Sequence, residues 1–428
     1  MKSLQRFRFI AAILLLLLTV QVLAPGRSAA AGKVIEQLPE PEWSYTLPEG
    51  ITFWGTIDSL QSKGRMFIPL VKTVTVSATQ KKSSGMLYAS VDRVNGSANW
   101  VYDYSDMAND KPFTAHHFYT TSSGYSYFYK NRGGVPYDLT AVDPNGKLKW
   151  TKYITGSYSP VVLDNGNIVI RTLVNMNKAS LDITEYNQEG KQLRKLKLTN
   201  KWAKGWLEVF PNGYIAHTIT NDKDNISSIS VYRGLGALTT PLATYTVPQS
   251  LINPYLVVKP LSGGSFLIQM DSTNSRVLIG YDANGKKKWV RTLNKGDQID
   301  TTGNNYLVRN DNVYRLYSKD NQLLGKQQIG ETGDNDWNFR ITPSGEITVE
   351  NQYQWQERPA DIDPETFEGD RAREDFYVLD PGNLQIKHHL STLWLDYEAG
   401  HNYIYAGNGE LYLTRGYAPK TISKYLLK

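Results

Sequence analysis

The sequence predicts an all-β fold, an eight-bladed β-propeller of four-stranded antiparallel blades whose last blade is closed by a strand from near the N-terminus. Three observations predict this fold: an aromatic-rich composition, a glycine turn that recurs eight times, and a second turn type between the glycine turns. Of 428 residues, 28 are Tyr and 10 are Trp. Aromatic side chains favour pleated, half-buried strand surfaces, so the composition indicates β-structure.

The first turn type places a glycine between two runs of alternating apolar residues. Glycine suits a tight hairpin because a positive φ costs a residue with a side chain about 1–2 kcal/mol. Each copy is therefore predicted to join strands A and B of one blade. The eight copies fall at Gly64, Gly124, Gly166, Gly213, Gly264, Gly303, Gly345 and Gly409.

The second turn type is predicted to join strands C and D. Its best copies are residues 90–100, 141–150 and 280–289, in which an Asp precedes Asn-Gly and a Trp follows. The Asp can accept hydrogen bonds from the turn backbone, and Asn-Gly permits a left-handed hairpin turn. The Trp side chains at the start of the following strands are predicted to wedge between neighbouring blades.

The order of the two turn types predicts where the blades lie. Residues 402–427 supply strands A, B and C only, whereas residues 40–48 resemble a strand D and precede the first strand A. We predict that these two segments form the eighth blade, because closure removes the unpaired strand edges that promote aggregation. The alternative is seven blades with the last segment as an extension. The seven other blades are predicted near 52–104, 115–154, 158–198, 206–247, 255–293, 297–329 and 337–390.

The second turn type resembles the quinoprotein-like (PQQ-like) β-propeller repeat, whose idealised unit reads Ala-x-Asp-x-x-Thr-Gly-x-x-x-Trp. Residues 90–100 match this spacing, with Ser90 for Ala and Asn95 for Thr, and the other two copies are one residue shorter. The resemblance implies a propeller for nearly the whole mature chain. The family includes quinone-dependent dehydrogenases and also non-catalytic binding propellers, such as the outer-membrane assembly lipoprotein.

Dehydrogenases of this family carry a quinone, a bound calcium, a catalytic Asp and commonly an adjacent-Cys disulfide. The chain has no Cys, and only Trp43, Trp100, Trp150 and Trp289 hold the Trp position of the repeat. We therefore expect a non-catalytic member without a cofactor. We also expect no metal site, because adjacent histidines such as His388 and His389 point to opposite faces of a strand and cannot chelate one ion.

The N-terminus predicts export. Three basic residues within the first eight precede an apolar run at 9–24, which is shorter than the roughly 20 residues that a membrane-spanning helix needs. Small residues follow at 28–31, so we expect 1–31 to be a signal peptide that is cleaved from a secreted, extracellular or cell-surface bacterial protein. Cleavage removes four of the 47 basic residues and leaves 43 against 41 acidic ones. We therefore expect a monomer that binds neither nucleic acid nor a membrane.

A ligand is expected on the face that carries the D–A and B–C loops, because the glycine turns on the opposite face are short and uniform. Residues 357–375 form a charged insertion between strands B and C of the seventh blade, either a surface loop or a flap that binds a partner or a cation. Exposed aromatic side chains beside polar groups suit a sugar ring or a peptide, although several could instead pack between blades. The candidate ligand-binding residues are Trp202, Trp206, Trp337, Trp355, Trp394, Tyr397, Arg132 and Arg340.

Two hypotheses of function follow. The first is a binding or scaffold module that engages a protein or a cell-wall or surface polysaccharide through this face. The second is a propeller enzyme (a lyase, hydrolase or sulfotransferase) whose site lies at the central channel. An enzyme should show at least three titratable side chains within hydrogen-bond reach at the channel mouth, with perturbed pKa values, and a binding module should show an open aromatic patch without such a cluster.

Overall fold

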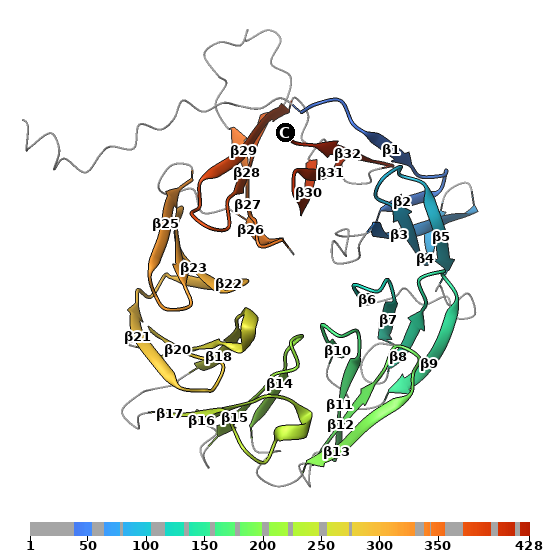
Figure 1. Cartoon of the computed structure of the whole chain (residues 1–428). Helices are drawn as coiled ribbons and strands as arrows, with labels where there is room; N and C mark the ends of the chain where they lie inside the picture. Colours follow the sequence, from blue (N-terminus) through green and yellow to red (C-terminus); the bar gives the residue numbers. More distant parts are fainter. Residues whose placement is uncertain are drawn as a thin grey trace, which may run out of the picture.

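The chain folds into a ring of eight antiparallel sheets, each with four strands (Figure 1). Eight blades rather than seven are therefore confirmed. Within the described residues, the helical elements are two short 3-10 turns, η2 (Leu235–Ala237) and η3 (Ser262–Gly264), and no described helix is long and apolar enough to cross a membrane. The computed structural model describes residues 38–53, 64–77, 80–103, 116–131, 137–154, 159–175, 180–198, 205–220, 226–247, 255–273, 276–329, 338–342, 344–355, 371–394, 401–415 and 420–428.

The strands of each blade follow one another in sequence, and they are numbered here from the N-terminus. Blades 1 and 2 contain β2 (Ile51–Phe53), β3 (Arg65–Ser77), β4 (Gln80–Asp92), β5 (Ala98–Asp103), β6 (His116–Thr120), β7 (Ser126–Asn131), β8 (Tyr137–Val142) and β9 (Leu148–Ile154). Blades 3 and 4 contain β10 (Val161–Val162), β11 (Ile168–Asn175), β12 (Ser180–Tyr186), β13 (Gln192–Leu198), β14 (Trp206–Val209), β15 (Ile215–Thr220), β16 (Ile226–Tyr232) and β17 (Ala243–Thr246).

The remaining blades continue this pattern. Blades 5 and 6 contain β18 (Tyr255–Pro260), β19 (Phe266–Asp271), β20 (Arg276–Tyr281), β21 (Lys287–Leu293), β22 (Gln298–Thr302), β23 (Asn305–Asn310), β24 (Val313–Ser318) and β25 (Leu323–Gln328). Blades 7 and 8 contain β26 (Asn338–Ile341), β27 (Ile347–Trp355), β28 (Arg371–Leu379), β29 (Ile386–Trp394), β30 (His401–Gly407), β31 (Glu410–Arg415), β32 (Thr421–Leu426) and β1 (Trp43–Thr46).

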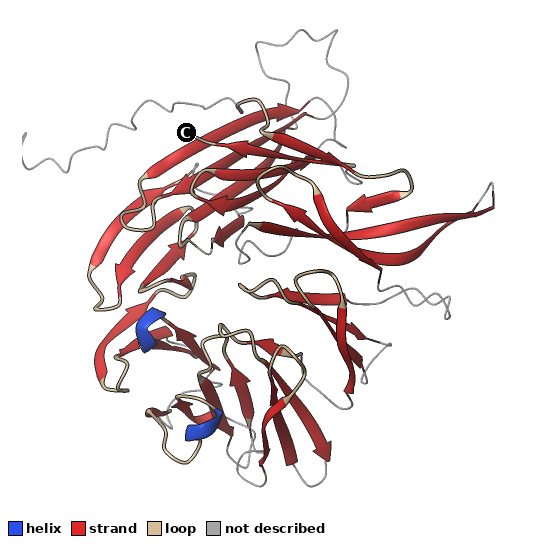
Figure 2. Cartoon of the chain, turned by 45° about the vertical axis from the view of Figure 1, so that its right-hand side comes forward, coloured by secondary structure: helices blue, strands red, loops and turns tan. Residues whose placement is uncertain are grey.

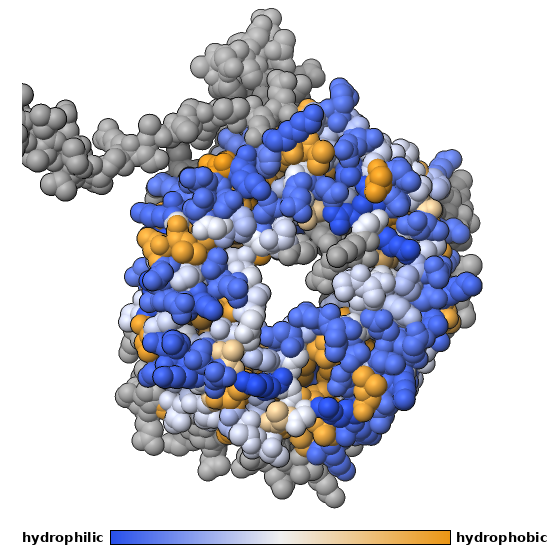
Figure 3. Space-filling view, in the orientation of Figure 1, coloured by the Kyte–Doolittle hydropathy of each residue, from blue (hydrophilic) through white to orange (hydrophobic). Residues whose placement is uncertain are grey.

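Strands A of the middle blades, such as β14, β18 and β22, lie nearest the centre of the ring in Figure 1. A space-filling view shows that the centre is open (Figure 3). Figure 2 shows one long hairpin that projects beyond the ring, formed by β3 and β4, which have 13 residues each. The hydrophobic core is divided into clusters that lie between successive blades, as where Leu207 and Val209 of blade 4 pack with Ile183 of blade 3.

The glycine turns have the conformation that the sequence predicts. At each of the eight A–B turns a glycine has φ between +56° and +87°, a region that residues with side chains rarely adopt. In the C–D turns, Asp92, Asp143 and Asp282 accept hydrogen bonds from backbone N–H groups two to four residues later. Both turn types are therefore local signals that set the register of each blade.

The Trp side chains of strands D wedge between neighbouring blades, as predicted. Trp100 Nε1 donates to Pro144 O at 2.9 Å, which places the ring against the C–D turn of blade 2. A Cβ on Gly146 would lie 2.6 Å from the Trp100 ring, so this turn needs glycine for space as well as for its positive φ. In blade 3, Arg194 occupies the strand D position that Trp holds in blades 1, 2 and 5, and its guanidinium lies against Gly236 of blade 4.

The N-terminal strand closes the ring. β1 pairs antiparallel with β32, with Trp43 opposite Lys424 and Thr46 opposite Thr421. Trp43 is buried, and its Nε1 donates to Arg93 O in blade 1 at 3.1 Å. The prediction that residues 40–48 supply the missing strand D is therefore confirmed.

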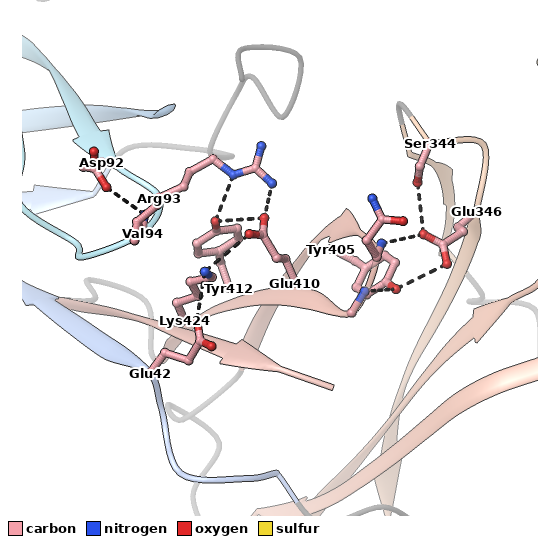
Figure 4. Close-up of polar contacts among 12 residues, drawn as sticks. Glu42, Asp92, Arg93, Val94, Ser344, Glu346, Tyr405, Glu410, Tyr412 and Lys424 are labelled. Carbon is pink, nitrogen blue, oxygen red and sulfur yellow. Dashed lines mark hydrogen bonds and ion pairs between the residues drawn. The ribbon is translucent and has the colours of Figure 1, made fainter. Parts of the chain in front are cut away.

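A group of charged residues holds this junction, and we call Glu42, Arg93, Glu410, Tyr412 and Lys424 the closing seam (Figure 4). Arg93 of blade 1 is hydrogen-bonded and ion-paired to Glu410 of blade 8, and its Nε donates to Tyr412 Oη at 3.2 Å. Lys424 Nζ lies 2.8 Å from Glu42 Oε2 and 3.3 Å from Glu410 Oε1. Each charge of the seam thus has an opposite charge in contact.

Between blades 7 and 8 lies another carboxylate whose hydrogen-bonding capacity is filled, which we call saturated. Glu346 is buried and accepts hydrogen bonds from Ser344 Oγ at 3.0 Å, from the Asn408 N–H at 2.8 Å and from Lys387 (Figure 4 shows the first two). Burial by itself raises the pKa of Glu346, but these hydrogen bonds outweigh it and hold the pKa below its usual value.

The predicted insertion at 357–375 is wrong at its C-terminal end. Residues 371–375 belong to β28, which pairs with β27 from Ile347 opposite Leu379 to Trp355 opposite Arg371. The charged residues at 371–375 are typical of a loop, which is why the sequence predicts one there. In the structure the antiparallel pairing with β27 includes these residues. Residues 357–370 lie outside the described residues.

Candidate functional site

The structure describes half of the eight predicted ligand-binding residues. Trp206 and Arg340 are described in full, whereas only the backbones of Trp355 and Trp394 are described. Their strands bring these two backbones to one end of blade 7, because Trp355 pairs with Arg371 and Trp394 with the adjacent Ala372. The other four, Arg132, Trp202, Trp337 and Tyr397, lie outside the described residues, as does the predicted signal peptide at 1–31.

Two exposed aromatic residues begin strands A of neighbouring blades. Trp206 is the first residue of β14 and is 60% exposed, so it does not follow the alternative in which these rings pack between blades. Tyr255 is the first residue of β18 and is 61% exposed. Both therefore lie at the D–A end of their strands, on the face where the sequence predicts the ligand.

Further along the same strands, blades 4 to 7 each place one charged residue at an equivalent position. Each residue lies two positions before the residue that opens the A–B turn, as Glu208 does before Phe210, whose N–H bonds Tyr214 O. From blade to blade the sign of the charge alternates. The four residues are Glu208, Lys259, Asp300 and Arg340.

Strand alternation sets the direction of these four side chains. Leu207 and Val209 pack against blade 3, so Glu208 between them faces blade 5. Likewise Val258 packs against blade 4, so Lys259 faces blade 6. The same rule turns Asp300 towards blade 7 and Arg340 towards blade 8, because their neighbours Ile299, Phe339 and Ile341 pack against the preceding blade.

Four more charged residues from strands B and C complete the group. Arg171, Arg309 and Glu350 lie on strands B of blades 3, 6 and 7, and Glu374 lies on strand C of blade 7. We call these eight residues, of which Arg171 and Glu374 are buried, the channel belt: Arg171, Glu208, Lys259, Asp300, Arg309, Arg340, Glu350 and Glu374.

The ion pair between strands A of blades 5 and 6 is loose. Lys259 Nζ lies 4.0 Å from Asp300 Oδ1, beyond hydrogen-bond distance, and their side chains are 23% and 44% exposed. The Arg309 guanidinium lies 5.3 Å from the centre of the Phe339 ring. Arg171 donates to Leu207 O. Within the described part of the chain, the carboxylates of Glu208, Asp300 and Glu350 accept no hydrogen bond from another residue.

Three carboxylates of the belt are harder to ionise than usual. Burial raises the pKa of Glu208, against the opposing charges of Arg171 and Lys259. Burial likewise raises the pKa of Asp300, which faces Lys259 and Arg309.

Glu350 is the most perturbed of the three. Burial and then the negative charge of Glu374 raise its pKa to about 7, although Arg340 opposes the shift. In all three cases removal from water outweighs the nearby cations.

In blades 2 and 3 the same position is uncharged. Its equivalents are Tyr119 in blade 2 and Val161 in blade 3, which lie two residues before Thr121 and Leu163 at the start of their turns. Both side chains pack in the clusters against the next blade. Going from blade 2 to blade 7, the charged positions of strand A thus begin at blade 4.

Blade 7 also holds a buried acid–base pair. His389 Nε2 lies 2.9 Å from Asp375 Oδ1, both side chains are buried, and the His389 ring stacks on Tyr377 at 4.0 Å between centres. Asp375, Tyr377 and His389 share the sheet face that packs against blade 6, so this pair is part of the core rather than of the belt. In the described ranges no group of three or more His, Asp or Glu could hold a metal ion.

Sequence reasoning named Trp206 and Arg340 as candidates but not the rest of the belt or Tyr255. The missing signal was available, because aligning the strands A by their glycine turns brings Glu208, Lys259, Asp300 and Arg340 into one column. Each residue by itself resembles any exposed charge on a half-buried strand. Their alternation from blade to blade is the informative feature.

No family model and no curated protein matches the chain. Membership of the quinoprotein-like family therefore stays a prediction. Similar solved structures include the Dos1 propeller (9% identity, 90% of this chain and 95% of that chain, TM-score 0.47), a eukaryotic initiation factor (10%, 92% and 90%, 0.47) and Hsv2 of Kluyveromyces lactis (10%, 77% and 96%, 0.43). At these scores the matches add nothing to the fold, which rests on the strand pairing itself.

Proposed function

We propose that this chain is a secreted binding module that holds a protein or a cell-surface polymer through the D–A/B–C face, at the side of the channel formed by blades 4 to 7. The observation that carries the proposal is the channel belt. Charged side chains on neighbouring strands A gather there, and in the described part of the chain the carboxylates of Glu208 and Asp300 accept no hydrogen bond from another residue. Trp206 and Tyr255 lie exposed at the heads of two of the same strands.

The energetics of the belt favour a ligand over a structural role. Burial of a carboxylate costs free energy unless hydrogen bonds compensate, and the raised pKa values of Glu208, Asp300 and Glu350 show that compensation is incomplete. A charge retained for stability would be saturated, as Glu346 is. Charged groups that are partly removed from water and still lack hydrogen-bond partners are typical of binding sites.

The location and partner follow from the sequence prediction. A cleaved signal peptide would deliver the protein outside the cytoplasm, where its ligands are other exported proteins or the polymers of the cell surface. The mature chain has nearly balanced charge, so non-specific attraction to nucleic acid is not expected.

A second candidate is an enzyme at the channel, and one observation favours it. Glu350 has a pKa of about 7, which suits a general acid or base at neutral pH, and Glu374 is close enough to raise it. If the protein is an enzyme, incubation with its bound polymer should release shorter products, and Glu350→Gln should abolish their release. Intact polymer after long incubation would exclude this candidate.

The proposal is tested by capture of extracellular proteins and cell-wall polymers on the purified mature protein, followed by mass spectrometry. The belt variant is Lys259→Gln with Asp300→Asn. Its matched control is Lys195→Gln with Asp182→Asn, an ion pair of the same chemistry at 3.1 Å on the outer strands of blade 3. We expect the belt variant to lose the partner and the control to keep it. Equal capture by both variants would overturn the proposal.

A further inference from the structure

The charge balance of the channel belt restricts the ligand. Along the strands A, two carboxylates, those of Glu208 and Asp300, are matched by two cations, Lys259 and Arg340. Positive and negative residues alternate along the strands A. Charges also interact between blades, because the positive charges of Arg171 and Lys259 both act on Glu208. Such a surface has little net field, so it does not select an anionic or cationic polymer by long-range attraction.

The donors and acceptors of the belt match hydroxyl groups. A hydroxyl donates one hydrogen bond and can accept two, whereas carboxylates only accept and ammonium or guanidinium groups only donate. Lys259 and Asp300, 4.0 Å apart, leave a gap that one hydroxyl can bridge, accepting from Nζ and donating to Oδ1. A row of alternating donors and acceptors is therefore suited to a molecule with many hydroxyls.

The exposed aromatic residues supply a stacking surface beside the belt. Trp206 lies two residues before Glu208, and Tyr255 lies four residues before Lys259, so each aromatic side chain is on the same side of its strand as the charge. Aromatic rings stack against the apolar C–H face of a sugar ring. Because the two aromatics begin strands of neighbouring blades, together they favour a chain of sugars over a single one.

We infer that the ligand of the channel belt is a neutral polysaccharide, with sugar rings against Trp206 and Tyr255 and hydroxyls hydrogen-bonded to Glu208, Lys259 and Asp300. This inference rests on the proposed binding function and narrows it to one chemical class. A peptide or an acidic polymer would be a different outcome of the test below.

The test is affinity electrophoresis of the mature protein in gels that contain soluble neutral polysaccharides: a β-glucan, a galactomannan, a xylan and a mannan. Polygalacturonate and polylysine serve as charged probes. We expect retardation by at least one neutral polymer. Its dissociation constant should change less than about threefold between 50 and 500 mM NaCl, because salt weakens attraction between charges and a neutral polymer carries no charge. Retardation by the charged probes alone would overturn the inference.

Variants locate the binding. Trp206→Ala with Tyr255→Ala, and separately Glu208→Gln with Asp300→Asn, should each weaken binding at least tenfold. Tyr153→Ala removes an equally exposed aromatic from the outer strand β9 and is the matched control, with binding expected to be unchanged. Equal loss in the control would show that the effect is not specific to the channel.

The two proposals fail differently. If no neutral polymer binds but the belt variant loses a protein in the capture experiment, the inference is wrong and the binding function stands. If belt variants leave every bound partner unchanged, both are wrong.

Discussion

The closing seam and the channel belt are both groups of charged residues contributed by neighbouring blades, but they differ in how their charges are satisfied. In the seam, Lys424 is only 8% exposed and lies 2.8 Å from Glu42 and 3.3 Å from Glu410. In the belt, the ion pair of Lys259 with Asp300 has 4.0 Å between its atoms.

The pKa values reflect the same difference. Burial opposes ionisation of Arg93, yet its hydrogen bonds to Glu410 and Tyr412 raise its pKa, which favours the charged form. Burial of Glu208 and Asp300 raises their pKa values, which disfavours the charged form. Saturated charges stabilise the ring, whereas the unsaturated ones cost stability and so require another reason to be present.

The largest effect is expected from removing the closing strand. Deletion of residues 41–48 exposes β32 as an edge and removes Trp43 from the core, and the Trp alone is worth about 3–5 kcal/mol. We expect thermal unfolding to lose more than about 5 kcal/mol of stability or to become non-cooperative, as followed by circular dichroism. Ser44→Ala with Thr46→Ala, which alters only exposed positions of β1, should leave the transition within a few degrees. An unchanged transition after the deletion would contradict the closure.

A pair of equivalent substitutions compares the two regions directly. Lys424→Met removes the cation that Glu42 and Glu410 share, while Arg93 still pairs with Glu410, and we expect a loss of about 1–3 kcal/mol in urea unfolding. Lys259→Met removes a loose, partly exposed pair worth about 1 kcal/mol or less. Similar losses in the two variants would show that the belt is as structural as the seam.

The raised pKa of Glu350 gives the belt a pH signature. Its folded-state pKa of about 7 lies above the ordinary 4.5, so between these values the folded state binds more protons than the unfolded state. Stability should therefore fall as pH rises from about 4.5 to about 7, by roughly 3 kcal/mol for this group.

Glu350→Gln should remove that fall. The variant should unfold at higher urea concentrations than the wild type at pH 8 and at nearly the same concentration at pH 4. Parallel pH profiles for the two proteins would show that Glu350 ionises normally. The outcome separates Glu350 from the buried Glu346 between blades 7 and 8, whose pKa is lowered rather than raised.

The smallest effect on stability is expected at the remaining acids of the belt. Glu208→Gln and Asp300→Asn replace carboxylates whose charged forms are disfavoured, so each should change the free energy of unfolding by less than about 1 kcal/mol, in the stabilising direction at pH 8. Differential scanning calorimetry of each variant measures this directly. A clear destabilisation would mean that these carboxylates support the fold.

The sequence predicts most of the fold because its signals are local. A glycine with positive φ or an Asp that caps its own turn is recognisable within a few residues, and each repeat supplies another copy. Even the closure was predictable, since Trp43 to Leu47 resembles strand D elsewhere. The end of the insertion at 357–375 was not, because charged residues such as Glu374 and Asp375 continue a strand whose partner lies before the insertion.

The site was less predictable because it depends on relations between blades. Nothing near Glu208 in the sequence indicates that Lys259, one blade further on, and Asp300, two blades further on, occupy the same register. The buried pair of Asp375 with His389 likewise depends on the register of β28 and β29. Trp206 was found because an aromatic residue at a strand head is visible without that register.

The central claim is that the channel belt serves a ligand and not the fold, and one measurement tests it most directly. The triple variant Glu208→Gln, Lys259→Met, Asp300→Asn should be compared with the wild type for both thermal unfolding and partner binding. We predict a melting temperature within about 2 °C of the wild type, about 1–2 kcal/mol at this size, and binding weakened at least tenfold. A variant that binds as tightly as the wild type, or that no longer folds, would contradict the claim.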